Sequence, residues 1–583
     1  MGVFKMGSWK ENALWGSLLV SMGTWGLACA EADDETVDLP VNASLALTPI
    51  MVVDSPQRAF IGQLDAVEVS GHIEHWNTNA ELFINDQLAN VSPDGRFSIM
   101  NDMDKGINFI HAQIVDDDKV LQEDKRSILN ATQIPINTAH EDALFLNLGE
   151  NIFNHVGDLA QLAITNTDFA EEFGNQLISG NGGCSNSVWF RNLTFDDIDF
   201  EFDFEPGRLN VGLRVQEPLF SIRTRIARDT FFGCIRDTTN ASISSNEISI
   251  LISYQVGTDE NNEPFIEFEN VDAAFDGFDL DVSGYPDPFI EWLTGDVSED
   301  LEQEIEETIE EESIEALDGI LKDMLPGVFS SDVGSSRITS TPHLSKFAAD
   351  AHGLTLSYGM TSEVEENDPL STYWSVGPQE PSPLPTPHPE RLDYGISLEI
   401  LNQLLAMSWQ NGVFNQTIAA KDIPMDFNPD DEDLKDASFN LKLQPVIRHD
   451  DEYGGLVFEM GEAQVEIEST HGEVLLEMAL AIRANIGFSR NEETGFIMID
   501  KNDFIGHSSV TASNKSDVSA LLVDALIEFE LDTALAEVNK ILRNFEIEGA
   551  LYSESDEDDG SFGFRTSESH LWFQIDPSIL FPL

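Results

Sequence analysis

The chain has 583 residues, of which 106 are Asp or Glu and 30 are Lys or Arg, so its formal net charge is −76. With 41% hydrophobic residues it can bury a core, and at roughly 100–200 residues per domain its length predicts about three to five domains. The acidity argues against nucleic acid as a partner and against adhesion to anionic membrane surfaces, because both need clustered Lys and Arg. An acid excess of this size also suits a saline habitat, which a titration of stability against salt would test.

The N-terminus has the pattern of an export signal. Two lysines precede an apolar run over residues 13–28, which has about the length of a signal-peptide core and is shorter than the roughly 18–20 residues of a membrane span. The run ends in Gly26-Leu27-Ala28-Cys29 and resembles a bacterial lipoprotein signal, although Gly26 stands where that motif usually has Leu. We therefore expect a signal peptide at 1–28, a lipid anchor on Cys29, and an exported protein at the cell envelope, on either side of an outer membrane. Ordinary secretory cleavage and a short core helix are the alternatives.

After a polar tether at residues 29–47, the pattern changes to short alternating strands separated by turns. Val67–Ser70 and Leu82–Ile84 alternate, and Ser92-Pro93-Asp94-Gly95 has the composition of a hairpin turn. Turn signals recur every 8–12 residues, as in an antiparallel sandwich. The segment 48–132 resembles a bacterial immunoglobulin-like module, which we expect to act as a spacer.

The next segment, 135–345, is expected to open with a helix and continue as long strands. Apolar residues at steps of three and four predict a helix from about Asp142 to Ala163, with Leu144, Leu148, Ile152, Val156 and Leu159 on one face. Strict alternation then predicts a strand with Phe200 and Phe202 on its dry face and Asp199, Glu201 and Asp203 on its wet face.

The same segment ends in a second predicted helix, from Asp296 to about Met324. Its apolar stripe includes Leu301 and Ile305, and its other face is almost wholly acidic. Only burial of the stripe outweighs repulsion between like charges, which costs roughly 0.2–0.5 kcal/mol per pair. If Cys29 is lipidated, Cys184 and Cys234 are left as an even pair in an exported chain, and we predict a disulfide between them.

Residues 346–392 read as a central segment and a linker, because six prolines fall between Pro378 and Pro389. Residues 393–583 then repeat the earlier theme. Ser397 can cap a helix that carries Leu404 and Leu405 and ends at Gly412. Strands follow, and a second long amphipathic helix is predicted from about Asp517 to Phe545, with Leu526 and Phe529 on its apolar face.

The second half of the chain resembles a known protein family. The phrase from Tyr394 to Leu405, continued by Trp409-Gln410-Asn411-Gly412-Val413-Phe414, resembles the start of the C-terminal barrel in the bactericidal/permeability-increasing and lipopolysaccharide-binding protein family. In that family, a first half that ends in an amphipathic helix is followed by a segment similar to Gly353–Gly359, then by a proline-rich linker and then by the second half, which is the order found here. The resemblance implies an α+β fold with two tubular barrels in a boomerang arrangement, each a long helix wrapped by a twisted antiparallel sheet, behind the all-β immunoglobulin-like sandwich.

The resemblance further implies an apolar pocket for acyl chains in each barrel. The opposing interpretation of the same side chains is plain core filling, which the pattern favours for any single residue. The lipid-pocket candidates are the apolar residues of the predicted helices and strands: Leu148, Ile152, Val156, Phe200, Phe202, Leu209, Val211, Leu213, Leu301, Ile305, Leu404, Leu405, Leu526 and Phe529.

One cationic stretch stands out in the acidic sequence. Its candidate ligands for a lipid headgroup are Arg208, Arg214, Arg223 and Arg225. A planar guanidinium suits a phosphate. The competing interpretation, which we favour, is pairing of these arginines with Asp199, Glu201 and Asp203 across the sheet.

The chain shows no glycine-rich phosphate loop, dinucleotide fingerprint or nucleophile elbow, so we expect no cofactor, no metal and no catalytic residues. The expected function is binding of phospholipid, lipopolysaccharide or another acyl-chain lipid, with or without transfer of that lipid, and no enzyme activity is expected. The alternative is a surface adhesion or scaffold protein with filled barrels. A hydrolase with dispersed residues is a weaker third possibility.

Overall fold

The structure is a computed structural model, and all statements below concern the residues that it describes. These are 48–76, 79–117, 119–172, 177–179, 187–230, 233–259, 264–282, 328–333, 336–365, 372–378, 383–420, 435–453, 455–490, 497–513, 520–543, 564–567 and 569–575. Residues from Pro49 onward belong to one compact unit.

Residues 48–131 form two small sheets around a core of their own. One sheet has the strand order β1 (Ile50–Ser55), β3 (Ala66–Glu74), β6 (Arg96–Asp102). The other has the order β2 (Ile61–Gly62), β8 (Lys119–Asn130), β7 (Gly106–Asp116), β4 (Glu81–Ile84), β5 (Gln87–Ala89). Alternating residues such as Val69, Leu82 and Ile114 are fully buried between the sheets. We call this part of the chain the N-terminal module.

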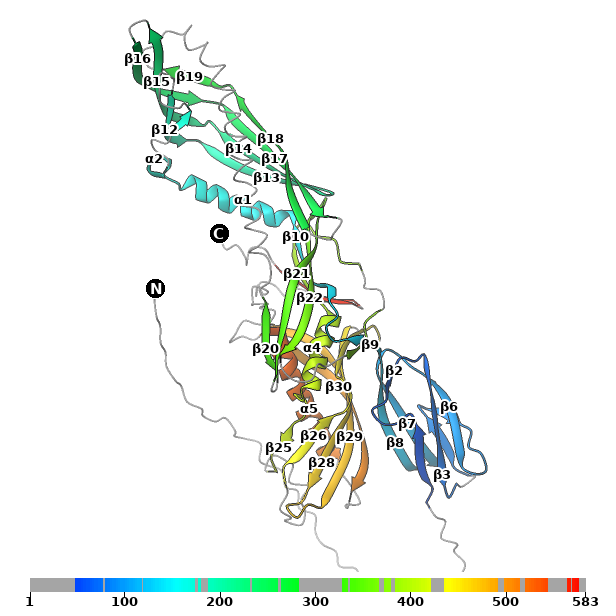
Figure 1. The fold of residues 1–583 in the computed structure, drawn as a ribbon. Coiled ribbons are helices and arrows are strands. Elements are labelled where there is room, and N and C mark those ends of the chain that lie inside the picture. Colours follow the sequence, from blue (N-terminus) through cyan, green and yellow to red (C-terminus); the bar gives the residue numbers. More distant parts are fainter. Residues whose placement is uncertain are drawn as a thin grey trace, which may run out of the picture. The chain divides into compact units, whose positions relative to one another are not determined.

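A seven-stranded sheet joins segments that are far apart in the sequence (Figure 1). Its order is β20 (Phe329–Val333), β21 (Ser336–Asp350), β22 (Gly353–Glu365), β10 (His140–Gly149), β24 (Leu392–Ser397), β32 (His570–Ile575), β31 (Phe564–Thr566). Central strand β10 pairs with β22 on one side and with β24 on the other. Both faces of β10 are covered, since Ala143, Leu144 and Phe145 are all fully buried.

Two further sheets are built from residues 177–282. One has the order β13 (Asp197–Glu205), β14 (Arg208–Gln216), β17 (Glu247–Thr258), β18 (Pro264–Asp276). The other has the order β11 (Leu177–Ser179), β12 (Ser187–Thr194), β15 (Leu219–Thr230), β16 (Gly233–Ser244), β19 (Asp279–Val282). Helix α1 (Glu150–Thr165) packs on β13, and the short α2 (Phe169–Glu172) packs on β12.

The C-terminal sheet has the order β25 (Thr417–Ile418), β26 (Ala437–Leu441), β28 (Gly455–Glu468), β29 (Val474–Arg490), β30 (Ile497–Ser513), with β27 (Val446–Asp450) also paired to β28. Helices α4 (Leu398–Gln410) and α5 (Ala520–Arg543) pack against it and against each other. The hydroxyl of Ser397 accepts the Glu399 N–H at 3.2 Å, which is the predicted N-cap. A two-stranded ladder, β9 (Thr132–Pro135) with β23 (Thr372–Ser375), lies beside α4.

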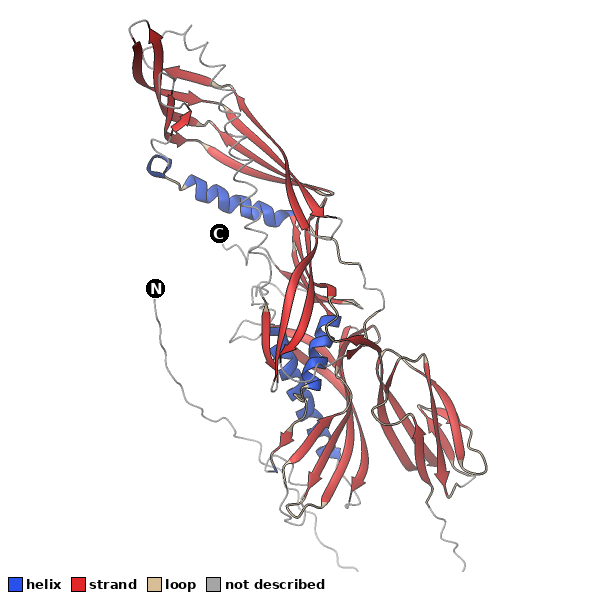
Figure 2. Cartoon of the chain, in the orientation of Figure 1, coloured by secondary structure: helices blue, strands red, loops and turns tan. Residues whose placement is uncertain are grey.

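The predicted fold class, α+β with two tubular barrels, is wrong. The described residues are 64% strand and 14% helix, and among them no long helix is wrapped by a sheet. The strands are distributed over several separate sheets, as Figure 2 shows. The predicted halves 135–345 and 393–583 also share one sheet, because β10 from the first pairs with β24 from the second.

The start of the first predicted helix is wrong as well. Residues 140–149 form strand β10, and α1 begins only at Glu150. Leu144 and Leu148 have helical spacing, but a strand buried on both faces is apolar at consecutive positions, so spacing alone does not separate the two. In the described part of the chain, no helix is long and apolar enough to cross a membrane.

Candidate functional site

One face of the β13–β14–β17–β18 sheet is largely apolar, and strand register fixes which residues share it. Phe202 faces Val211, Val211 faces Ile252, and Ile252 faces Val271, which makes a continuous apolar row across four strands. Parallel rows pass through Ile198, Phe200 and Phe204. Because β-strands alternate, Asp199, Glu201 and Asp203 lie on the opposite face. We call the first face the apolar face and the second the polar face.

The rows of the apolar face are not equally covered. The outer rows are mostly buried, with Ile198 at 3% exposure and Phe204 at 5%. In the row of Phe202 and Val211, by contrast, all four side chains are partly exposed. An apolar row in the middle of a sheet is normally the best buried part of it, so this strip is an incompletely filled surface.

Helix α1 covers the β13 side of this strip. Phe153 from α1 packs against Phe202 and Phe204, with ring centroids 5.7 and 4.9 Å apart. Gly157 lets the helix come close, since a Cβ there would lie 3.0 Å from Cβ of Phe200 and 3.3 Å from Cε2 of Phe202. One flank of the helix keeps apolar side chains in contact with solvent, and Val156 is 38% exposed.

The remaining lipid-pocket candidates divide between core and surface. Leu148, Ile152, Leu209, Leu404, Leu405 and Leu526 are all buried in one large hydrophobic core. Phe529 is 38% exposed on α5, where its ring lies 6.1 Å from that of Phe439. Leu213 is partly exposed on the apolar face beside Phe200. Leu301 and Ile305 lie outside the described residues, as do Cys29 and Cys184, so the anchor and the Cys184–Cys234 pairing stay predictions.

Two of the four candidate headgroup arginines are paired with carboxylates on the polar face. The Arg214 guanidinium donates to Glu201 at 2.7 Å, and Arg208 donates to Glu269 at 2.8 Å. Neither residue lies on the apolar face. Arg225 donates to the Ser187 hydroxyl at 2.8 Å and lies over the Trp189 ring, while Arg223 is exposed on the same strand.

A second candidate site, missed by sequence reasoning, lies where the N-terminal module meets the C-terminal sheet. The carboxylate of Glu459 in β28 has no exposed surface and is bound by Arg448 at 3.0 Å and by Arg483 at 2.6 Å. It also accepts the backbone N–H of Ile107 in β7 at 2.9 Å, while Arg483 donates to the Ile107 carbonyl at 2.9 Å. A buried carboxylate in an acidic chain gives no recognisable sequence signal.

A second carboxylate makes a similar contact further along the junction. Glu462 is 2% exposed and accepts the Ser127 N–H of β8 at 2.7 Å and Arg58 at 3.3 Å. Arg58 also donates to the Ser509 hydroxyl of β30 at 2.9 Å and pairs with Asp124. Burial raises the pKa of Glu462, and the nearby Arg58 opposes that shift.

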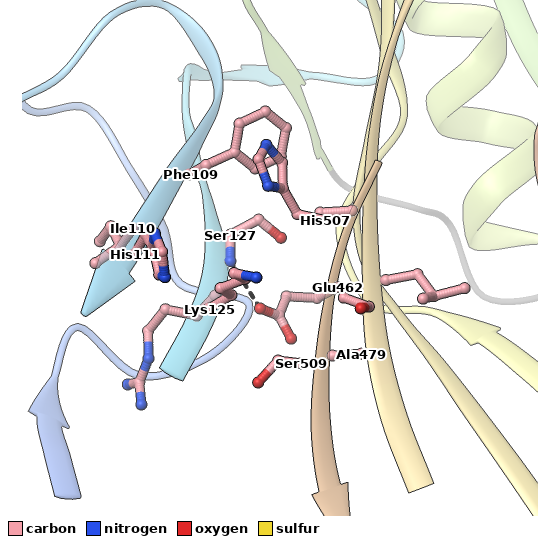
Figure 3. A pocket seen from close by; sticks show the side chains of 13 residues that line it. Phe109, Ile110, His111, Lys125, Ser127, Glu462, Ala479, His507 and Ser509 are labelled. Atoms are coloured by element: carbon pink, nitrogen blue, oxygen red, sulfur yellow. Dashed lines mark hydrogen bonds between the residues drawn. The ribbon is translucent and has the colours of Figure 1, made fainter. Parts of the chain in front are cut away.

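A cavity of about 30 Å³ lies within this junction, large enough for roughly one water molecule. Figure 3 shows Glu462 reaching toward Ser127, and His507 of β30 lying against Phe109 of β7. The two rings are 4.6 Å apart between centroids. The other lining residues include His111, Lys125 and Ser509. The junction is thus made of buried ion pairs, backbone hydrogen bonds and one aromatic contact.

Two buried polar clusters contain residue types that occur in catalytic sites, namely Ser, His, Tyr and Glu. The Ser569 hydroxyl lies 2.8 Å from Nδ1 of His570, whose Nε2 lies 3.0 Å from the Asp142 carbonyl oxygen. Both side chains are buried, so the hydroxyl is not open to a substrate. In the second cluster the Tyr373 hydroxyl donates to Glu399 at 2.6 Å and lies 3.0 Å from Nε2 of His140. Burial lowers the pKa of both histidines and raises that of Tyr373, which suits neutral structural groups.

Among the described residues, no group of three or more His, Cys, Asp or Glu side chains is placed to hold a metal ion.

Comparison with known proteins gives a likeness in structure only. No protein-family model matches the chain, and no curated protein matches it in sequence. A crystal structure of lipopolysaccharide binding protein aligns over 74% of this chain and 98% of its own, with TM-score 0.41 and 12% identity. The crystal structure of P47 of Clostridium botulinum E1 aligns over 75% of this chain and 100% of its own, with TM-score 0.22 and 10% identity. Likenesses this distant assign no function.

Proposed function

We propose that the protein binds an acyl-chain lipid on the apolar face of the β13–β14–β17–β18 sheet, next to α1. One observation carries the proposal: the middle row of that face, from Phe202 through Val211 to Ile252, is apolar and partly exposed. Exposed apolar area costs about 25 cal/mol per Å², so an acyl chain that covers this strip is stabilised there. No covalent chemistry is required.

The strip is also elongated, because its row crosses all four strands of the sheet, which suits a chain rather than a compact ligand. Phe153 of α1, which is itself partly exposed, packs on Phe202 at the β13 end of the strip. Each methylene that leaves water contributes about 0.8 kcal/mol, so a long acyl chain gains more than a small apolar molecule. Phospholipid and lipopolysaccharide both carry such chains. Export and anchoring through Cys29 would place the protein at the envelope, where these lipids are found.

The test compares lipid load in two tryptophan variants. Mature protein purified without detergent is analysed by native mass spectrometry and by organic extraction. Val211→Trp fills the strip, whereas Leu251→Trp adds the same side chain on the polar face, where Leu251 faces Gly212 and is 46% exposed.

We expect one or two lipids per wild-type chain, an unchanged load in Leu251→Trp and a clearly reduced load in Val211→Trp, with both variants folded. A wild-type mass without lipid, together with no uptake of fluorescent lipid, would instead favour the adhesion or scaffold function. The C-terminal sheet is tightly packed, and the N-terminal module is joined to it by apolar contacts. Both features are consistent with that alternative.

A further inference from the structure

The junction between the N-terminal module and the C-terminal sheet contains a titratable ring in a cationic setting. His507 is half-buried in β30, and its ring lies against Phe109 of the module. The ring faces the module and not α5, because the preceding residue, Gly506, has its backbone against Ile527 of α5. Whatever charge His507 carries is therefore placed at the junction itself.

The charged groups around His507 come from four strands, β7 and β8 of the module and β28 and β29 of the C-terminal sheet. From the module, His111, Lys125 and Arg126 line the same cavity, and from β28 so does Glu462. From β29, the Arg483 guanidinium lies 5.1 Å from the Phe109 ring centroid. Burial lowers the pKa of His507, and Lys125, His111 and Arg483 add to that shift because they disfavour a positive charge on its ring.

The carboxylates in the junction are already engaged by other groups. Glu123 lies 3.1 Å from His111 and 3.2 Å from Lys125, and Asp124 pairs with both Arg58 and Arg126. Glu462 accepts from Ser127 and Arg58, and Glu459 from Arg448 and Arg483. Among the contacts of the described residues, a protonated His507 therefore gains no carboxylate of its own.

We propose that His507 makes this junction a pH-sensitive latch, which holds the N-terminal module on the C-terminal sheet while the ring is neutral and releases it when the ring is protonated. Protonation adds a cation to a half-buried site beside Phe109 that already holds Lys125, Arg126 and Arg483. The module would then be a docked domain at neutral pH and a mobile one in acid. This device is independent of lipid binding.

The sign of the effect follows from the direction of the pKa shift. Since the pKa of His507 is lowered in the docked structure, its contribution to docking is complete above the ordinary value of 6.5 and is lost as the pH falls below that value. Glu462 acts in the opposite direction, because its pKa is raised and its protonation on acidification favours docking. Variants of His507 alone separate the two contributions.

Two backbone amides report docking directly. The N–H groups of Ile107 and Ser127 belong to the module, but they donate to Glu459 and Glu462 across the junction. Their hydrogen exchange, measured by mass spectrometry with fragmentation to single residues and corrected for intrinsic rates, is compared at about pH 7.5 and about pH 5. The variants are His507→Gln, which is permanently neutral, and His507→Arg, which is permanently charged.

We expect protection of both amides to fall by roughly fivefold or more in acid in the wild type, because the docked state binds the proton of His507 more weakly than the released state does. His507→Gln should keep its protection at both pH values, and His507→Arg should lack it at both. His72→Gln, which changes an exposed histidine on the opposite sheet of the module, should behave like wild type. An unchanged wild type, or an equal loss in His507→Gln, would overturn the latch.

Discussion

The β13–β14–β17–β18 sheet and the C-terminal sheet have the same kind of amphipathic pattern, but their apolar faces are buried to different degrees. In the C-terminal sheet, Phe458, Val465 and Met478 have no exposed surface and share one hydrophobic core with residues of α4 and α5. In the β13–β14–β17–β18 sheet, the corresponding middle row stays partly exposed beneath α1. Alternation of apolar and polar residues therefore shows that one face of a sheet is apolar. It does not show whether protein or ligand covers that face.

The largest expected difference between the two sheets concerns the removal of a buried ring. Phe458→Ala should lower the free energy of unfolding by about 4 kcal/mol, because a fully buried ring leaves a cavity. Phe202→Ala should cost roughly half as much, since that side chain is already partly in contact with solvent. Denaturant unfolding of both variants measures the difference. Equal costs would mean that the apolar face is as well filled as the C-terminal core.

The C-terminal core contains a buried carboxyl group, which should make the stability of the protein depend on pH. Glu530 lies on the buried stripe of α5, is 1% exposed, and burial raises its pKa from 4.5 to about 8. The native state therefore binds the proton more tightly than the unfolded state does. Stability should fall as the pH rises between these two values, by roughly 1.4 kcal/mol per pH unit.

Glu530→Gln should remove that slope and be the more stable protein at pH 8, as thermal unfolding across the pH range would show. Asp524→Asn, on the exposed face of the same helix, is the control and should keep the slope. If Glu530→Gln kept the wild-type slope, the carboxyl would not be the titrating group.

The local sequence pattern was sufficient to predict a helix or a strand where that element is amphipathic by itself. The Ser397 cap and the helix that follows it were predicted from a polar residue before an apolar stripe, and α5 was predicted to within three residues at each end. The alternating strand β13 was predicted because its period of two is complete within nine residues. The turn that follows it contains Pro206-Gly207, a pair that favours turns, and Gly207 has a positive φ of 76°.

Long-range pairing was not accessible from the sequence. Nothing in the sequence of β10 indicates that it pairs with β22 and β24, which lie more than two hundred residues away. Because β10 is buried on both faces, its apolar residues also include the spacing that is typical of one face of a helix. The junction was missed because Glu459 and Glu462 are two acids among 106. What distinguishes them is burial next to arginines, which only the tertiary fold creates.

A smaller difference is expected where α1 meets the apolar face. Gly157→Ala would place a Cβ 3.0 Å from Cβ of Phe200, which forces the helix away from β13. The expected loss is about 1–2 kcal/mol from overpacking, reduced by the better helix propensity of Ala, which is worth up to about 1 kcal/mol. Gly212→Ala, whose Cβ would be 3.5 Å from the nearest atom on the polar face, should cost less. A stabilised Gly157→Ala would show that α1 is not held tightly on the sheet.

The smallest expected effect separates the two interpretations of the arginines. Arg214 and Glu201 are both more than half exposed, so Arg214→Gln should change the free energy of unfolding by less than about 0.5 kcal/mol. Because Arg214 lies on the polar face, the variant should also keep the wild-type lipid load. Arg225→Gln is the contrasting variant, since Arg225 is half-buried against Trp189 and bonded to Ser187, and it should cost more stability. Loss of lipid from Arg214→Gln alone would place the headgroup on the polar face, and the acyl-chain strip would then have to be sought elsewhere.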